Sequence, residues 1–288
     1  MESIFLKNLF TSDLHGNKKK YALLFRVIEK EKPNAVFIGG DIFPNTYSSS
    51  ESVSDFLEEH LFQPLKRVRK KSLKEMRVFI ILGNDDPRIN EECLIKADKE
   101  QLIDYVNGKT VPYNEYFVTG YSYIPPTPFQ LKDWEKYDIS RYVEFNSISP
   151  EEGYRSVKVE KDIMQFSTIS EDLKKLVKNA PPEKTIFLFH APPYGTNLDR
   201  ADLDGIHVDH APLDVHIGSI AIQRFIKKFQ PHLTLHGHVH ETVRLTNKWR
   251  ELIGKTYAFS GSHEQHEFCY ISFDLHDLEK ASRAQIMI

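Results

Sequence analysis

Short apolar runs that each end in glycine and a polar residue constrain the fold of this chain most strongly. The run at residues 35–38 is followed by Gly39-Gly40-Asp41, and the run at 78–82 is followed by Gly83-Asn84-Asp85-Asp86. Apolar, β-branched runs bounded by turn residues are typical of buried strands. Segments with apolar residues at helical spacing separate these runs, so strand and helix alternate through the first third of the chain. The sequence therefore predicts an α/β fold.

The same patterns predict the individual elements. Strands are expected at residues 4–10, 35–38, 78–82, 116–118, 121–123, 185–189 and 233–235, with a terminal pair at 257–259 and 270–273. Helices are expected before Pro33, at 51–71 with a break or kink at Pro64, at 94–106, around 173–177 and at 219–229. Ser219 is the predicted N-cap of the last of these helices.

Residues 130–170 follow none of these patterns clearly. Their periodicity is poor and aromatic residues are frequent, among them Trp134, Tyr137, Tyr142, Phe145 and Tyr154. A long stretch without regular structure inside a compact domain is often functional. We expect one domain over residues 1–288, with an insertion or lid at 130–170.

Composition excludes several classes of protein. A net charge of −3 over 288 residues gives no overall basic footprint for nucleic acid, and no apolar run approaches the roughly 20 residues that span a bilayer. Cys93 and Cys269 are far apart and do not form a disulfide framework, and the first ten residues lack the apolar core of a signal peptide. These features predict a soluble, cytoplasmic protein.

Polar residues with metal-binding side chains follow the predicted strands. They are three oxygen donors and four imidazoles: Asp13, His15, Asp41, Asn84, His190, His238 and His240. The carboxyl ends of strands are where an α/β sheet gathers a reactive site. This donor set contains no thiolate and suits Mn²⁺, Fe²⁺ or Zn²⁺. The natural interpretation is a pair of divalent ions, with Asp41 placed to bridge them.

These blocks resemble, in order, the motifs of the calcineurin-like metallophosphoesterases: D-x-H, G-D, G-N-H-D/E, a lone H and G-H-x-H. The resemblance implies a four-layer α/β-β/α sandwich of two facing mixed sheets flanked by helices. It also implies that one metal ion is held by Asp13, His15 and His240, and the other by Asn84, His190 and His238, with Asp41 bridging. Asp41, Asn84, Asp85 and His190 are the implied catalytic positions.

The chain departs from the family pattern at Asp85, where the family usually has histidine. That histidine contacts the substrate phosphate and can protonate the leaving oxygen. An aspartate with an unperturbed pKa of about 3.9 is a poor acid at neutral pH and would repel a phosphate. Our hypothesis is that His216 or His236 supplies the proton, or that the substrate leaves well without one.

The predicted function is phosphoester hydrolysis by attack of a metal-bridging hydroxide. Phosphodiesters are favoured over monoesters because they carry less charge to be repelled by Asp85 and Asp86. The substrate is expected to be a small phosphoester, with Tyr194, Thr196 and His216 as candidate contacts. Four further loop histidines, at 207, 210, 263 and 266, are either substrate contacts or solvated residues. The alternatives are a protein-binding scaffold of the same fold and a nuclease, and the oligomeric state stays open.

Overall fold

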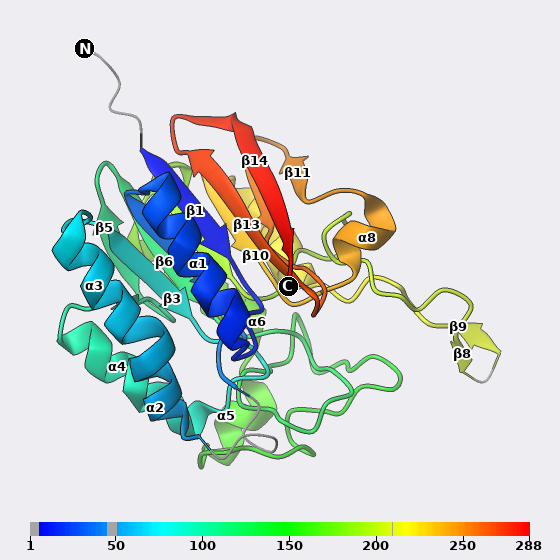
Figure 1. Cartoon of the computed structure of the whole chain (residues 1–288). Helices are drawn as coiled ribbons and strands as arrows, with labels where there is room; N and C mark the ends of the chain where they lie inside the picture. The colour runs from blue at the N-terminus through cyan, green and yellow to red at the C-terminus, as the bar shows by residue number, and fades with distance from the viewer. Residues whose placement is uncertain (1–5, 45–50, 209) are drawn as a thin grey trace.

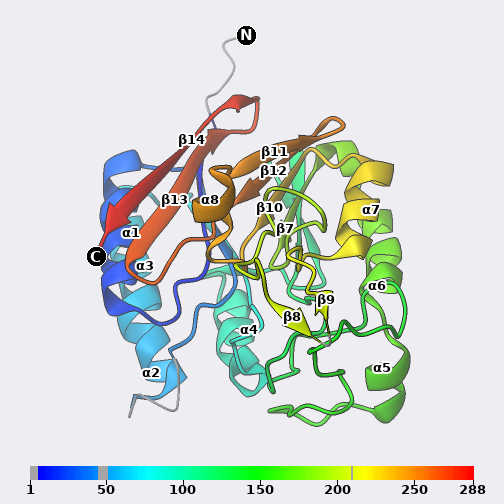
Figure 2. The same ribbon diagram turned by 90° about the vertical axis from the view of Figure 1, so that its right-hand side faces the viewer.

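Two six-stranded mixed sheets lie face to face, and helices cover the outer side of each (Figure 1 and Figure 2). The computed structural model describes residues 6–44, 51–208 and 210–288. The first sheet has the order β14 (Asp277–Met287), β13 (Glu267–Asp274), β1 (Lys7–Thr11), β2 (Ala35–Gly39), β3 (Arg77–Ile81), β4 (Asp104–Tyr105). The second has the order β11 (Arg250–Ile253), β12 (Thr256–Ser260), β10 (Leu233–His236), β7 (Thr185–Phe189), β6 (Tyr116–Tyr121), β5 (Thr110–Tyr113). A two-stranded ribbon, β8 (His207–Val208) and β9 (Ala211–Pro212), projects from the body (Figure 1).

Alternation of side chains along the central strands produces the layers. Leu9 and Val36 pack in a core under the helices, while their neighbours Phe10 and Phe37 belong to a second core that also contains Leu188 of the opposite sheet. Successive strand residues point to opposite faces of a sheet, so a continuous apolar strand serves both cores. The four-layer α/β-β/α sandwich predicted from the sequence is therefore confirmed.

The helices divide between the two outer faces. The first sheet is covered by α1 (Lys18–Glu31), α2 (Val53–Leu57), α3 (Gln63–Lys71) and α4 (Glu91–Lys99). The second is covered by α6 (Ile169–Leu176) and α7 (Ile220–Phe229), and Ser219 caps α7 by accepting the Ile222 N–H over 3.0 Å. Two short helices, α5 (Lys161–Phe166) and α8 (Thr242–Thr246), lie in connecting segments. Within the described residues, no helix combines the length and the apolar character that crossing a bilayer requires.

Several predicted elements need correction. The expected helix at 51–71 is interrupted by a π-helical turn, Glu58–Phe62, just before Pro64, which has no N–H to continue the α pattern. The helix expected at 94–106 ends at Lys99, and the chain then turns through Gln101, with a φ of 57°, into β4. The runs at 116–118 and 121–123 belong largely to one strand, β6, and residues 4 and 5 of the first predicted strand lie outside the described residues.

The expected terminal strand pair does not exist as a pair. β12 lies in the second sheet between β10 and β11, whereas β13 lies in the first sheet between β1 and β14. The longest strand, β14, was not predicted because only part of its sequence alternates and most of its residues are exposed or half-buried. Each of these strands finds its partner through tertiary packing, which the local pattern does not encode.

Candidate metal centre

The site lies where loops at the carboxyl ends of strands from both sheets come together. Loops after β1, β2 and β3 carry Asp13, Asp41 and Asn84, and loops after β7 and β10 carry His190 and the pair His238 and His240. Backbone hydrogen bonds join these loops: the Asp13 N–H donates to Gly40 O over 3.0 Å, and the Gly237 N–H donates to His190 O over 3.0 Å. Across the two sheets, His190 Nδ1 lies 2.8 Å from Gly39 O. Main-chain hydrogen bonds thus join the loops within each sheet, and the His190 side chain joins the two sheets.

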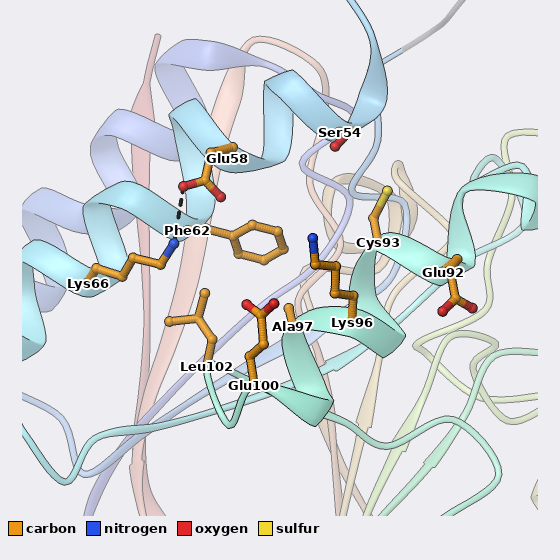
Figure 3. A pocket seen from close by; sticks show the side chains of 10 residues that line it. All are labelled: Ser54, Glu58, Phe62, Lys66, Glu92, Cys93, Lys96, Ala97, Glu100 and Leu102. Carbon is orange, nitrogen blue, oxygen red and sulfur yellow. Dashed lines mark hydrogen bonds and ion pairs between the residues drawn. The ribbon is translucent and has the colours of Figure 1, made fainter.

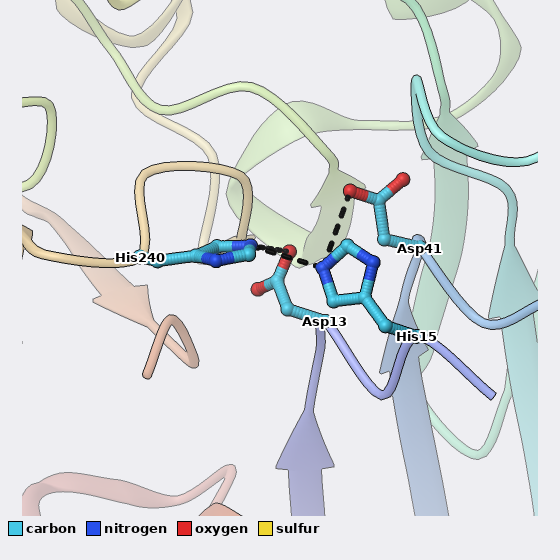
Figure 4. Close-up of side chains that lie close together, drawn as sticks. All are labelled: Asp13, His15, Asp41 and His240. Carbon is cyan, nitrogen blue, oxygen red and sulfur yellow. Dashed lines mark hydrogen bonds and ion pairs between the residues drawn. The ribbon is translucent and has the colours of Figure 1, made fainter. Parts of the chain in front are cut away.

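Four of the predicted ligands form one tight group. Asp13, His15, Asp41 and His240 each place a donor atom within 4.8 Å of the others (Figure 4). His15 Nε2 lies 3.0 Å from His240 Nε2 and 3.8 Å from Asp41 Oδ2, and His240 Nε2 lies 3.6 Å from Asp13 Oδ1. Two imidazole nitrogens and two carboxylates converge on one point, which is a donor set that fits a divalent cation.

The other three predicted ligands lie beside this group. His190 Nε2 is 3.0 Å from Asn84 Oδ1 and 3.3 Å from Asp41 Oδ2. The rings of His190 and His238 have centroids 5.3 Å apart. Asp41 therefore contacts a histidine of each group, His15 on one side and His190 on the other.

Backbone conformation is unusual at four of these positions. Asp13, His15, Asp41 and His238 have positive φ angles of 56°, 45°, 51° and 75°. Left-handed conformations are uncommon outside glycine, and non-glycine residues held in them cluster at functional sites. These four are among eleven non-glycine residues with positive φ in the described ranges, so the conformation coincides with the donor chemistry at these positions without being confined to them.

Three glycines leave no room for side chains around the donors. A Cβ atom at Gly83 would lie 2.2 Å from Asp41 Oδ1, one at Gly40 2.6 Å from His190 Nδ1, and one at Gly237 2.9 Å from Asp13 Oδ2. Contacts this short do not occur in folded proteins, so glycine is required for the ligands to reach their observed positions.

Burial and charge set the protonation of the donors. Burial alone would raise the pKa of Asp41, but the charge of His190, its hydrogen bond and the charge of His15 together outweigh burial and lower that pKa to about 2. Burial, with the charge of His190 added, lowers the pKa of His238 to about 3. A deprotonated carboxylate and a neutral imidazole are the forms that bind a metal ion.

Asp86, which follows Asn84 and Asp85 in the loop after β3, joins this loop to the loop after β2. Its carboxylate is fully buried and accepts the N–H groups of Ile42, Phe43 and Gly83 at 2.7 to 3.1 Å. It joins the loop of Asp41 to the loop of Asn84. Sequence analysis gave it no structural role, although its position in the Gly83-Asn84-Asp85-Asp86 block was a usable signal.

The predicted substrate contacts lie on a loop organised by Asp199, which sequence analysis missed. The fully buried Asp199 carboxylate accepts the N–H groups of Gly195 and Thr196 at 2.9 Å and lies 2.8 Å from His216 Nδ1. The Thr196 hydroxyl donates to Pro193 O, and the Tyr194 hydroxyl donates to Asp214. All three predicted contacts thus have partners within this loop, and their contact with substrate stays a prediction.

His236 does not fit the role of proton donor. It is fully buried, with Nδ1 2.8 Å from Ala191 O and Nε2 2.8 Å from Thr234 Oγ1. Burial lowers its pKa to about 4. Both ring nitrogens have internal partners, so this part of the proton-donor hypothesis was wrong. Among the other loop histidines, His263 is buried, whereas His207, His210 and His266 are exposed.

A groove elsewhere on the molecule does not include the clustered donors. It has a volume of about 220 Å³, lies between α2–α3 and α4, and is lined by Phe62, Lys66, Cys93 and Lys96 among others (Figure 3). Its walls are helices that cover the first sheet. The donor cluster is recognised by its chemistry.

Two facing mixed sheets with carboxylate, amide and imidazole donors at their shared edge define the class of metal-binding phosphoesterases. A family model described as calcineurin-like phosphoesterase matches residues 6–242. The chain belongs to the calcineurin-like phosphoesterase family, a family of phosphoric ester hydrolases, and the resemblance drawn from the sequence is confirmed.

Solved structures agree on the fold. The protein TT1561 of Thermus thermophilus is similar with a TM-score of 0.58 and 17% identity, covering 98% of this chain and 99% of that one. A dimetal phosphatase from Danio rerio is similar with a TM-score of 0.53 and 9% identity, again over 98% and 99% of the two chains. Identities this low establish the shared fold alone.

One curated relative matches over a shorter stretch. An uncharacterized protein of Methanocaldococcus jannaschii, MJ1162, is 37% identical over 78 residues. The match spans 26% of this chain and 32% of the relative, about a third of its length. The relative therefore assigns no activity to the whole chain.

Proposed function

We propose that the chain is a dinuclear metal-dependent phosphodiesterase. In this proposal Asp13, His15 and His240 hold one ion, Asn84, His190 and His238 hold the other, and Asp41 is shared. The observation that carries the proposal is the position of Asp41, whose Oδ2 atom lies 3.8 Å from His15 Nε2 and 3.3 Å from His190 Nε2. A buried carboxylate between two groups of ligands is what a bridging role requires.

The cofactors proposed are two divalent ions of the Mn²⁺, Fe²⁺ or Zn²⁺ type. When bound, such ions neutralise charge on the phosphoryl oxygens and lower the pKa of a bound water. The protein's own contribution is to fix the donors: Gly39 O orients the His190 ring, and the Asp13 carboxylate is held by the His238 N–H over 3.1 Å. Pre-organised donors of this kind lower the cost of reaching the transition state.

Asp85 supports the preference for diesters. Its side chain is 55% exposed next to the donors, so it presents negative charge toward solvent at the site. A phosphomonoester dianion would be repelled more strongly than a diester monoanion. The substrate proposed is a small phosphodiester, and the nuclease alternative gains nothing from a chain of net charge −3.

Fewer candidates remain for the group that protonates the leaving oxygen. Partial burial and the charge of Asp41 raise the pKa of Asp85 to about 6, but a nearby divalent cation favours the carboxylate form. Because His236 is excluded as the proton donor, we propose either that His216 donates the proton or that the leaving group needs none. His216 is about one-third exposed and paired with Asp199, an arrangement that could orient the ring for proton transfer.

A protein-binding role is the second candidate, supported by the distribution of exposed apolar side chains. Of the twelve exposed large hydrophobic residues in the described ranges, seven fall between residues 129 and 166: Phe129, Ile139, Tyr142, Phe145, Tyr154, Ile163 and Phe166. Concentrated exposed apolar surface is typical of interaction sites. The insertion could therefore bind a partner while the donor cluster carries out hydrolysis.

The location proposed for the protein is the cytoplasm. Both Cys93 and Cys269 are free, and Cys269 is fully buried. Free cysteines persist in reducing compartments. The oligomeric state is left open by this proposal.

Hydrolysis of matched chromogenic substrates tests the function. Metal-stripped protein reloaded with Mn²⁺ should hydrolyse bis-p-nitrophenyl phosphate faster than p-nitrophenyl phosphate, and Asp41→Asn should abolish both activities. Asp277→Asn is the control, because that carboxylate is 37% exposed and pairs with Lys280 in β14. Faster monoester turnover would overturn the diester preference. Absence of metal-dependent turnover in folded protein would favour the protein-binding role.

A further inference from the structure

Asp85 contacts three of the metal-binding side chains at once. Its backbone N–H donates to Asp41 Oδ1 over 2.9 Å, and its Oδ1 accepts the Asn84 Nδ2 amide over 2.9 Å. Its Oδ2 lies 3.6 Å from His15 Nδ1. The three residues belong to the loops after three different strands, so Asp85 lies at their junction.

The two nitrogens of the His15 ring face different groups. Nε2 points to the donor cluster, 3.0 Å from His240 Nε2, while Nδ1 points to Asp85. The ring is 27% exposed, so part of it has no packing neighbour. At 3.6 Å this approach is longer than a hydrogen bond, but the carboxylate charge favours the tautomer that carries the proton on Nδ1 and leaves Nε2 free as a ligand.

The contact between Asp85 and Asn84 determines which atom of the Asn84 amide, Oδ1 or Nδ2, faces the other donors. Asn84 can serve as an oxygen ligand only if Oδ1 and not Nδ2 faces the metal side, where His190 Nε2 lies 3.0 Å from Oδ1. Because Asp85 accepts from Nδ2, the reversed amide would place its oxygen against a carboxylate oxygen. Asp85 thus determines the orientation of one ligand in each of the two groups.

We propose that Asp85 is a positioning residue that orients His15 and Asn84 as metal ligands, and not the proton donor of the reaction. The inference rests on the dinuclear assignment proposed above. The carboxylate accepts from Asn84 through Oδ1 and attracts the Nδ1–H of His15 through Oδ2, whereas a protonated histidine at this position could only donate. The aspartate therefore exchanges the usual histidine's contact with phosphate for tighter control of the ligands.

Metal affinity measured without substrate tests the inference. We expect chelator competition to show two Zn²⁺ ions bound by the wild-type protein, and about 10- to 100-fold weaker binding of at least one ion by Asp85→Ala. Asp85→Asn should lie between them, because its single oxygen can accept from one partner only. Asp277→Asn, which removes the same charge at a partly exposed position in β14, should bind Zn²⁺ as the wild type does.

The ring nitrogens of His15 give a second readout. In ¹⁵N-labelled, Zn²⁺-loaded wild-type protein, the shifts of His15 should report a protonated Nδ1 and a metal-bound Nε2, and Asp85→Ala should lose this pattern. If Asp85→Ala binds both ions with wild-type affinity and keeps the His15 shifts, the inference is overturned. Wild-type protein that binds fewer than two ions would instead overturn the dinuclear assignment, so the two failures are distinguishable.

Discussion

The indole N–H of Trp134 donates to the backbone carbonyl of Asp86 over 2.8 Å, and both residues are fully buried. This contact joins the irregular segment at 130–170 to the loop that carries Asn84. The same segment is fixed at a second point, where the Asp138 carboxylate accepts the Ile220 N–H over 2.7 Å at the start of α7. The beginning of the predicted insertion is therefore anchored to the core on both sides of the site.

Replacing Trp134 should loosen this anchor. Trp134→Ala removes the largest fully buried side chain and should lower the free energy of unfolding by about 3–5 kcal/mol. Trp134→Phe keeps much of the packing and should cost less, mainly the hydrogen bond to Asp86 O, about 1 kcal/mol. Urea unfolding measures both costs, and hydrogen exchange should show faster opening of residues 130–138 in the alanine variant. Equal stability of Trp134→Ala and wild type would contradict this account.

Asp86→Asn should destabilise the protein and disorganise the site together. The asparagine keeps one acceptor oxygen, and its NH₂ group faces backbone N–H donors that the carboxylate now satisfies. Leaving buried donors unpaired costs about 1–3 kcal/mol each. We expect lower stability in urea and weaker metal binding in the same variant. Asp98→Asn is the matched control, because its carboxylate accepts the Tyr105 N–H away from the site, and a similar loss of metal binding there would remove the assigned role from Asp86.

Gly83→Ala should affect the donors directly. The added methyl would lie 2.2 Å from Asp41 Oδ1 and 2.6 Å from His190 Cε1, so both side chains must move. A displacement of about 1 Å in a catalytic group can cost about 100-fold in rate, and we expect a loss of that order. Gly108→Ala is the comparison: no atom lies within 4 Å of its added methyl, although its φ of +69° carries strain of about 1 kcal/mol. An active Gly83→Ala enzyme would show that the donors tolerate displacement.

The two cysteines should differ in reactivity. Burial raises the pKa of the Cys269 thiol to about 12, so at pH 8 almost none of it is the reactive thiolate. Cys93 is half-buried and lines the groove between α2–α3 and α4 (Figure 3). Ellman's reagent at pH 8 should therefore modify one thiol in native protein and two in denaturant, with Cys93→Ser giving none in the native state. Two fast thiols in native protein would show that the pairing of β13 with β14 around Cys269 opens readily.

The sequence could predict that the candidate donors lie close together because they follow short, fully apolar strands. Such strands, like the one before Asp41, can be predicted from the local sequence pattern. The carboxyl ends of parallel strands lie at the same edge of a sheet. Asp199 was not predicted, because its role depends on the backbone N–H groups of its loop. The types of the residues in the loop do not indicate where those groups point. The pairing of β13 with β14 was missed for a similar reason: a half-exposed strand has a weak pattern, and its partner is chosen by the tertiary structure.

The left-handed backbone at Asp13, His15, Asp41 and His238 lowers the stability of the fold at positions that we propose are needed for catalysis. Each such residue costs about 1 kcal/mol that glycine would avoid at the same backbone angles. Selection for the stability of the metal-free chain alone would therefore favour glycine at these proposed ligand positions. With metal stripped from both proteins, His15→Gly should resist heat as well as its parent, while its affinity for the proposed metal should fall. An engineer who seeks a more heat-resistant enzyme should leave these four positions untouched and look for gains elsewhere in the chain.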